Sequence, residues 1–277
     1  MLEVNLFDEN FRQSVCSVAF AVPETISYVR DNRAYPGITM FTDGYVIDGL
    51  PESVRSRYKI GWLHEPQCLH ARNYLPERLS DTGLDLILTY YKPLLELPGF
   101  AFAPYGGIWI NRKDWYITSK TKKLSMLFGL KRSTEGHRIR HEISESISSK
   151  DIDYYGFKGK ATNYSAETKL MVHGDYSFSI VSETCREDNL FTEILLDCFI
   201  VGTVPIFWGC PNIGDYFNAD GILSFETVDE LKDIVSELSP EMYISMKKAI
   251  LDNFFTAQKY AITEDWIFYN VLLGEFA

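Results

Sequence analysis

Two glutamates flank a polar loop in the stretch FSIVSETCREDNLFTEILLDCFIVGTVPIFWG, residues 178 to 209. The apolar run 176–183 predicts a strand that ends at Glu183, and the apolar spacing after Thr192 predicts a helix with Glu193 in its first turn. In open α/β sheets, ligands bind beyond the carboxyl ends of the strands, where helix N-termini present unpaired N–H groups. A carboxylate at this place can hydrogen-bond a hydroxyl-rich ligand. Alternatively, Glu193 is a capping residue at the third helical position.

Basic residues gather in one part of an otherwise acidic chain. The formal net charge is -11, which argues against a general nucleic-acid binder because such affinity comes mainly from Lys and Arg side chains that neutralise phosphates. Between residues 120 and 140 the chain nevertheless carries Lys120, Lys122, Lys123, Lys131, Arg132, Arg138 and Arg140. This cluster indicates either a local site for an anionic ligand or a solvated basic face.

The elements that must position these residues follow an alternating pattern. In the first half, strands are predicted at 14–20, 37–43, 59–66, 84–91 and 102–110, with helical segments at 23–32 and 66–79. In the second half, strands are predicted at 123–129, 152–157, 176–183 and 203–209, with helices at 136–149 and 191–201. Alternation of this kind predicts doubly wound α/β domains with mostly parallel sheets.

The domain boundary is expected in the polar segment 111–123, which has no clean hydrophobic period. We therefore expect domains at 1–118 and 119–277. The tail from residue 228 onward predicts two or three amphipathic helices, the last of them at 263–273. This last helix is expected to pack back on the first domain.

The bulk composition is that of a globular protein. A chain of 277 residues with 46% hydrophobic residues is long enough for two cores. The 5 cysteines contain no CxxC pair, so neither a zinc site nor a disulfide framework is indicated and a reducing compartment fits best. No apolar run reaches the roughly 18 residues of a membrane span, and the first residues do not read as a secretory signal. These features lead us to expect a cytoplasmic protein without an integral membrane segment.

The second half resembles the signature of glycosyltransferase family 10, the α-1,3/1,4-fucosyltransferases. Members read roughly "F-x-E-N-S/C … D-Y-x-T-E-K … G-x-V-P-V/I", and the matching residues here are Phe178, Glu183, Cys185, Thr192, Glu193, Gly202, Val204, Pro205 and Gly209. The resemblance implies a GT-B fold, with two Rossmann-like doubly wound domains that face each other across a cleft. The N-terminal domain would bind the acceptor, and the C-terminal domain would bind a nucleotide-sugar donor.

The resemblance extends upstream over about residues 58 to 260. GHRIRHEI (136–143) is similar to the family segment whose arginine meets the donor diphosphate, which would be Arg140. KIGWLHEP (59–66) is similar to the segment that ends in the catalytic carboxylate, which would be Glu65. Two positions depart from the family, which has a lysine where this chain has Ile194 and a tyrosine where it has Leu190.

These departures mean that another cation must neutralise the phosphates, or that the donor pocket is modified. Lys131, Arg138 and Arg186 are the candidate substitutes. The donor-binding set implied by the resemblance comprises Arg140, Glu193, Glu183, Thr184, Cys185, Arg186, Thr192, Lys131 and Arg138.

The implied reaction is an inverting transfer of fucose from GDP-fucose to a glycan hydroxyl. Glu65 lies between apolar residues and Pro66, a setting that favours a general base with a raised pKa. Its neighbour His64 is an alternative base or an orienting residue, and Tyr105 and Gly106 are candidate cleft residues or part of a tight turn. No cofactor and no metal are expected, and the D-x-D element at Asp151 and Asp153 is interpreted as a loop or capping pair.

Two alternatives stay open from the sequence. One is a transferase of the same fold that uses another nucleotide sugar, and the other is a catalytically silent protein that binds glycans or nucleotide sugars. The expected partners are a donor and a glycan acceptor, without nucleic acid. Family members from eukaryotes are membrane-anchored, so a bacterial or viral origin is expected.

Overall fold

A computed structural model describes residues 1–9, 11, 15–18, 21–157, 159–160, 163 and 165–275. The chain forms two compact units. Unit 1 comprises Met1–Gly107, Asp188–Leu190 and Ile262–Ala277, and unit 2 comprises Ile108–Glu187 and Phe191–Ala261. None of the helices in the described ranges is long and apolar enough to cross a bilayer.

The boundary between the units lies after Gly107, whereas the sequence pattern placed it at 118. The reason is hydrogen bonding by the intervening segment, because Trp109 N–H and Ile110 N–H both donate to the buried Asp197 carboxylate of unit 2. Farther along, Thr118 N–H donates to the Val201 carbonyl. The segment 108–118 is thus part of unit 2 and not a free linker.

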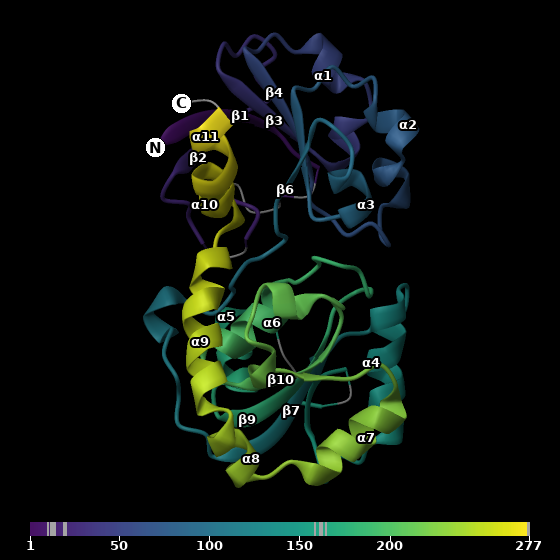
Figure 1. Ribbon diagram of the computed structural model, residues 1–277, viewed down its shortest axis with the longest axis vertical. Helices are drawn as coiled ribbons and strands as arrows, with labels where there is room; N and C mark the ends of the chain where they lie inside the picture. Colours follow the sequence, from purple (N-terminus) through teal and green to yellow (C-terminus); the bar gives the residue numbers. More distant parts are fainter. Residues whose placement is uncertain are drawn as a thin grey trace. The chain divides into compact units, whose positions relative to one another are not determined.

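Unit 1 is built on a six-stranded parallel sheet (Figure 1). The strands are β1 (Leu2–Phe7), β2 (Ile26–Arg30), β3 (Ile38–Thr42), β4 (Tyr58–Leu63), β5 (Leu86–Thr89) and β6 (Phe100–Phe102), in the order β2-β1-β3-β4-β5-β6. Apolar residues such as Val4, Leu6, Met40, Ile60 and Leu88 form its core. Because β1 leads to β2 on one side and β3 begins the other side, the strand order reverses between β1 and β3.

The helices of unit 1 are short. They are α1 (Leu50–Ser53), α2 (Pro76–Leu79), α3 (Lys92–Leu95), α10 (Thr263–Ile267), a π-helical turn (Phe268–Leu272) and α11 (Leu273–Glu275), with 3-10 turns at Asp43–Val46 and Ala71–Tyr74. Ile267, Val271 and Leu272 pack into the core of the sheet. The C-terminal helix therefore belongs to unit 1.

Three expectations for unit 1 need correction. Residues 15–18 of the expected strand 14–20 form no strand, and residues 14, 19 and 20 lie outside the described part of the chain. The segment 23–32 forms strand β2 instead of a helix, because Ile26, Tyr28 and Val29 are β-formers. In place of the expected strand 102–110, strand β6 ends at Phe102, and the positive φ values of Gly106 and Gly107, 66° and 94°, are incompatible with a strand through the rest of that segment.

Unit 2 is built on a five-stranded parallel sheet. Its strands are β7 (Lys122–Phe128), β8 (Asp153–Gly156), β9 (Tyr176–Ser182), β10 (Val204–Trp208) and β11 (Leu223–Ser224), in the order β11-β10-β9-β7-β8. The chain runs from β7 outward to β8, returns to β9 and continues to β10 on the other side. The strand order consequently reverses between β7 and β9, which is where open α/β sheets bind ligands.

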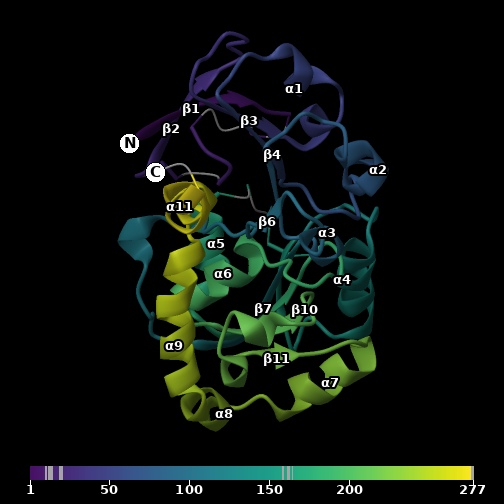
Figure 2. The same ribbon diagram turned by 45° about the horizontal axis from the view of Figure 1, so that its top comes forward.

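Helices cover both faces of the unit 2 sheet. They are α4 (Glu135–Ser146), α5 (Ala166–His173), α6 (Glu193–Ile200), α7 (Val228–Glu237), α8 (Pro240–Ser245) and α9 (Lys247–Ala257), with 3-10 turns at Arg112–Asp114, Ile213–Asp215, Ala219–Gly221 and Gln258–Tyr260. Helices α4 and α7 lie side by side on one face, as do α5 and α6 on the other (Figures 1 and 2). In β7, Met126 packs with Ile143 of α4, whereas Leu127 packs with Val172 of α5, as the two-residue period of a strand requires. The sheet is therefore doubly wound.

Candidate ligand-binding site

A pocket of about 360 Å³ lies in unit 2 at the carboxyl ends of β7 and β9. It is lined by Trp109, Met126, Leu127, Phe128, Gly129, Leu130, Lys131, His137, Arg140, Lys169, His173, Ile180, Val181, Ser182, Glu193 and Ile194. The N-terminal halves of α4 and α6 border it, so the positive ends of these two helix dipoles lie at its wall. Its place at the strand-order reversal and its cations make it the candidate site for an anionic ligand.

Arg140 is fixed at the wall of this pocket. Its Nε donates to Ser182 Oγ at 2.8 Å, and a second guanidinium nitrogen donates to the Ser182 carbonyl oxygen. Helix α4 comes close enough for this contact because residue 136 is glycine. A Cβ at Gly136 would lie 1.7 Å from the Glu183 carbonyl oxygen. The planar guanidinium is held at the end of β9, in a geometry suited to phosphate oxygens.

Glu193 opens helix α6 and lines the same pocket. Thr192 is the N-cap, and its side chain accepts a hydrogen bond from Ile194 N–H. Glu193 is thus the first residue of the helix, which corrects the alternative of a capping residue at the third position. Its side chain lies at the N-terminus of α6 and is 15% exposed, so a ligand hydroxyl can reach the carboxylate.

Glu183 lies behind Glu193 and does not line the pocket. It is fully buried, and its two carboxylate oxygens accept hydrogen bonds from the N–H and the hydroxyl of Thr192, both at 2.9 Å. Burial, together with the nearby Glu193, raises the pKa of Glu183 to about 7. Glu183 and Thr192 therefore fix the loop that leads into α6.

Lys169 on α5 lines the pocket and was not identified from the sequence. Its side chain is 5% exposed, and its ammonium lies 3.3 Å from Asp197 Oδ2 and 3.9 Å from Glu193 Oε1. The ammonium also lies 5.1 Å from the centroid of the Trp109 ring. A signal did exist, because Lys169 shares a helix face with Val172 at a spacing of three residues, and a lysine on an apolar face is rarely buried without a partner.

Two imidazoles in the pocket carry no charge at neutral pH. Burial, with the nearby Arg140 and Lys131, lowers the pKa of His137 to about 4, and burial also lowers the pKa of His173 well below its ordinary value. His137 and His141 are both buried. His141 bonds through Nε2 to the Lys131 carbonyl at 3.1 Å and packs against aromatic rings.

The other candidate donor residues separate into two groups. Lys131 lines the pocket. Arg138 is exposed on α4 and does not line it, and Arg186 pairs with Glu226 at 2.6 Å beside a separate hollow of about 180 Å³. Thr184 and Cys185 lie on the loop after β9 without lining the pocket, although the Thr184 carbonyl accepts a hydrogen bond from Gly136 N–H at 3.0 Å.

In unit 1, Glu65 is the second residue after β4. Asp43, after β3, accepts hydrogen bonds from the backbone N–H groups of His64 and Glu65, both at 2.9 Å, while the Tyr74 hydroxyl donates to the Glu65 carbonyl at 2.6 Å. Asp43 is fully buried and has a φ of 47°. Residues other than glycine rarely adopt this left-handed backbone conformation, so the surrounding contacts must hold it there. These contacts fix the backbone that presents the Glu65 carboxylate.

His64 is less suited to act as a base than its neighbour. It is buried, stacks on Tyr105 with the ring centroids 4.3 Å apart, and packs edge-on against Trp62. Burial lowers the pKa of His64 to about 3, which leaves the ring neutral and weakly basic. Tyr105 therefore acts as a stacking partner of His64, and Gly106, with its positive φ, forms the turn that follows.

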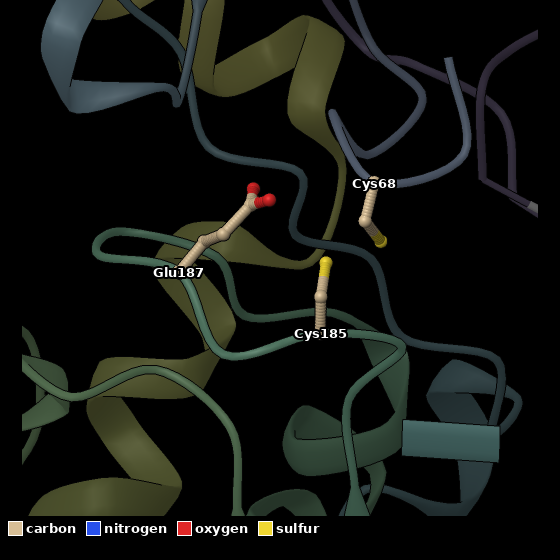
Figure 3. A group of neighbouring side chains, drawn as sticks. All are labelled: Cys68, Cys185 and Glu187. Atoms are coloured by element: carbon tan, nitrogen blue, oxygen red, sulfur yellow. The ribbon is translucent and has the colours of Figure 1, made fainter. Parts of the chain in front are cut away.

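Possible metal ligands occur in two places among the described residues. Asp153 lies in β8 and accepts a hydrogen bond from the Tyr176 hydroxyl at 2.6 Å, so the D-x-D element is partly used inside unit 2. Figure 3 shows Cys185 and Glu187 on the loop after β9, together with Cys68. Because Cys68 belongs to unit 1 and the other two to unit 2, neither unit holds this group alone.

Comparisons with known proteins place the fold. No protein-family model matches the chain. The α-(1,3)-fucosyltransferase of Helicobacter pylori is 24% identical over 121 residues, and the match covers 42% of this chain and 24% of that enzyme. The resemblance to the α-1,3-fucosyltransferases, recognised from the motifs around Glu183 and Glu193, is confirmed by this similarity.

Solved structures extend the similarity to nearly the whole chain. A crystal structure of an α1,3-fucosyltransferase with GDP-fucose is 13% identical, with a TM-score of 0.58, over 94% of this chain and 92% of that one. An α,α-trehalose-phosphate synthase (UDP-forming) from Burkholderia xenovorans is 9% identical, with a TM-score of 0.57, over 84% and 72% of the two chains. The expectation of a GT-B fold with two parallel-sheet α/β domains is therefore confirmed.

Proposed function

We propose that this protein is a glycosyltransferase that moves fucose from GDP-fucose to a hydroxyl group of a glycan. The observation that carries the proposal is the pocket at the strand-order reversal of unit 2, where Ser182 holds Arg140 beside Lys131 and Glu193. The similarity to an α1,3-fucosyltransferase bound to GDP-fucose supports the choice of donor.

The proposed reaction is a single displacement with inversion. The acceptor oxygen attacks the anomeric carbon of fucose, the bond to the β-phosphate oxygen breaks, and GDP leaves with the bonding electron pair. Glu65 takes the proton of the acceptor hydroxyl, a role that the neutral, weakly basic His64 fills poorly. Arg140 and Lys131 would stabilise the charge on the departing diphosphate, and we propose that the reaction needs no metal ion.

Another nucleotide sugar is the second candidate for the donor, and one observation favours it. Ile194 lines the pocket next to Glu193, at a position where the resemblance implies a phosphate-binding lysine. An apolar residue there changes the wall that faces the donor.

The experiment is a donor-hydrolysis and transfer assay with a panel of GDP-, UDP- and dTDP-sugars, with and without EDTA. We expect turnover of GDP-fucose that EDTA does not reduce. Arg140→Ala should lower kcat/KM by about 10- to 100-fold, because a charge-assisted hydrogen bond contributes roughly 1.5–3 kcal/mol. Arg132→Ala is the matched control, because Arg132 is exposed and faces Glu145 at 3.6 Å.

Glu65→Ala should abolish transfer while donor affinity stays unchanged, because Glu65 belongs to unit 1 and the donor pocket to unit 2. The exposed Glu52 provides its control as Glu52→Ala. Turnover of a different nucleotide sugar, without turnover of GDP-fucose, would show that the donor is that sugar nucleotide and not GDP-fucose. Donor binding with no turnover above that of Glu65→Ala would instead identify a binding protein.

A further inference from the structure

Lys169 is the most deeply buried cation at the wall of the pocket. It lies in the middle of α5 (Ala166–His173), and its side chain is 5% exposed although it lines a cavity open to ligands. Burying an ammonium is costly unless it is paired, so the position needs an explanation.

Two carboxylates of α6 hold the ammonium in place. Glu193 and Asp197 are one helical turn apart and approach Lys169 Nζ to 3.9 Å and 3.3 Å. Burial opposes the charge of Lys169, but these two carboxylates outweigh it and raise the pKa of the ammonium. Lys169 is therefore charged at neutral pH.

The two carboxylates use only part of the hydrogen-bonding capacity of the Lys169 ammonium. Asp197 Oδ1 already accepts hydrogen bonds from Trp109 N–H at 2.9 Å and Ile110 N–H at 3.1 Å, which keeps the carboxylate turned toward that segment. An ammonium has three N–H donors, and in the described part of the chain only Glu193 and Asp197 form ion pairs with it. The two ion pairs account for at most two of these donors, and Lys169 lines the pocket beside Trp109.

The charge balance of the pocket depends on Lys169. Lys131, Arg140 and Lys169 are the cations among its lining residues, Glu193 is a carboxylate that lines it, and Asp197 is the carboxylate paired with Lys169. His137 and His173 are neutral, as shown above. With Lys169 the set carries one net positive charge, and without it the positive and negative charges cancel.

We infer that Lys169 is a phosphate-binding residue of this pocket, contributed by α5 at the place where α6 presents the apolar Ile194. The ligand class is a diphosphate ester, which Lys169 would contact from the side opposite to Arg140 on α4. The inference rests on the proposed function, since it assigns a ligand contact within the same donor site.

The test compares diphosphates with the matching nucleosides. Wild type, Lys169→Met and the exposed-site control Lys150→Met are titrated by calorimetry with GDP, UDP, dTDP, guanosine, uridine, thymidine and inorganic pyrophosphate. We expect Lys169→Met to weaken the binding of diphosphates by about 10- to 100-fold and that of nucleosides by less than about 2-fold. A merely structural role would weaken both alike, and equal affinities in wild type and Lys169→Met would also overturn the inference.

A second variant guards against misfolding, because removal of Lys169 leaves two carboxylates without their cation. Lys169→Met combined with Ile194→Lys places a lysine one residue from Glu193 on the same pocket wall. We expect it to recover diphosphate affinity to within about 5-fold of wild type. Lack of recovery in a folded double variant, judged by an unchanged circular dichroism spectrum, would contradict the inference.

The outcomes separate this inference from the proposed function. Loss of UDP or pyrophosphate affinity in Lys169→Met, without any turnover of GDP-fucose by wild type, would support the phosphate-binding role of Lys169 and contradict GDP-fucose as the donor. Turnover of GDP-fucose with an unchanged KM in Lys169→Met would do the reverse. Wild type that binds no diphosphate at all would overturn both.

Discussion

Replacing Glu183 with glutamine should make the protein more stable at alkaline pH. Glu183 is fully buried, and its carboxyl group bonds the N–H and the hydroxyl of Thr192. When protonated, the carboxyl keeps one accepting oxygen for the N–H and gains a donor for the hydroxyl oxygen. A glutamine amide offers the same pair, so Glu183→Gln reproduces the protonated state at every pH.

The magnitude follows from the pKa of Glu183, which burial raises from 4.5 to about 7. The unfolded chain releases this proton near pH 4.5 and the folded protein near pH 7. Between these values the unfolded state binds fewer protons, so folding stability falls as the pH rises. The difference of roughly 2.5 pKa units corresponds to a loss of about 3 kcal/mol in folding stability. This loss is complete well above pH 7 and absent well below pH 4.5.

The assay is urea unfolding of wild type and Glu183→Gln from pH 5 to pH 8.5. We expect an advantage of the glutamine variant of about 1 kcal/mol at pH 5 that rises to about 3 kcal/mol at pH 8.5. Asp197 and Glu264, whose pKa values burial also raises, are common to both proteins and cancel in the difference. Glu142→Gln, at an exposed position of α4, is the control. A difference that stays constant within about 0.5 kcal/mol over this range would refute the reasoning.

Three further substitutions test other parts of the structure. Gly136→Ala puts a methyl group against the Glu183 carbonyl oxygen, so the free energy of unfolding in urea should fall by about 2 kcal/mol or more; a change below about 0.5 kcal/mol would contradict the close packing of α4 on β9. Asp43→Ala removes the acceptor of the Glu65 N–H, and we expect a loss of about 1–3 kcal/mol in thermal unfolding together with a reduced kcat, both largely restored in Asp43→Asn. Ile143→Ala empties a fully buried position in the core of unit 2 and should cost about 2–5 kcal/mol in urea unfolding, whereas the calorimetric affinity for diphosphates should not change.

Much of unit 2 could be predicted because its elements carry strong local patterns. The helix around Arg140 and the strand that leads to Glu183 lie within three residues of their expected bounds. Apolar runs bounded by polar loops identify buried parallel strands, and Thr134 and Thr192 mark the starts of helices as N-caps.

Unit 1 was harder to predict because its connections are short. Its helices in the first 107 residues have four residues each, too short for a hydrophobic period to develop. Strand β1 (Leu2–Phe7) was missed, since its alternation of apolar and polar residues covers only a few positions. Tertiary packing, and not local preference, decides the structure of such segments.

The site was predicted in part. Arg140, Glu193 and Lys131 line the pocket as expected, and their roles there stay predictions. Arg138 could have been excluded from the sequence, because residues two apart on a helix point to nearly opposite sides. Lys169 belongs to a helix that no motif marks, and only the folded unit shows that its ammonium reaches α6.

The division of unit 1 into separate stretches of chain bears on the order in which the protein assembles during synthesis. Residues 1–107 leave the ribosome long before Ile267 and Leu272, which pack in the core of the same sheet. Glu264 and Asp265 also accept hydrogen bonds from the backbone N–H groups of Ser17 and Thr25, which precede β2 in the chain. Part of the apolar surface of the six-stranded sheet should therefore stay uncovered until the five-stranded unit has been translated. During this interval the nascent chain is most exposed to aggregation and most dependent on chaperones.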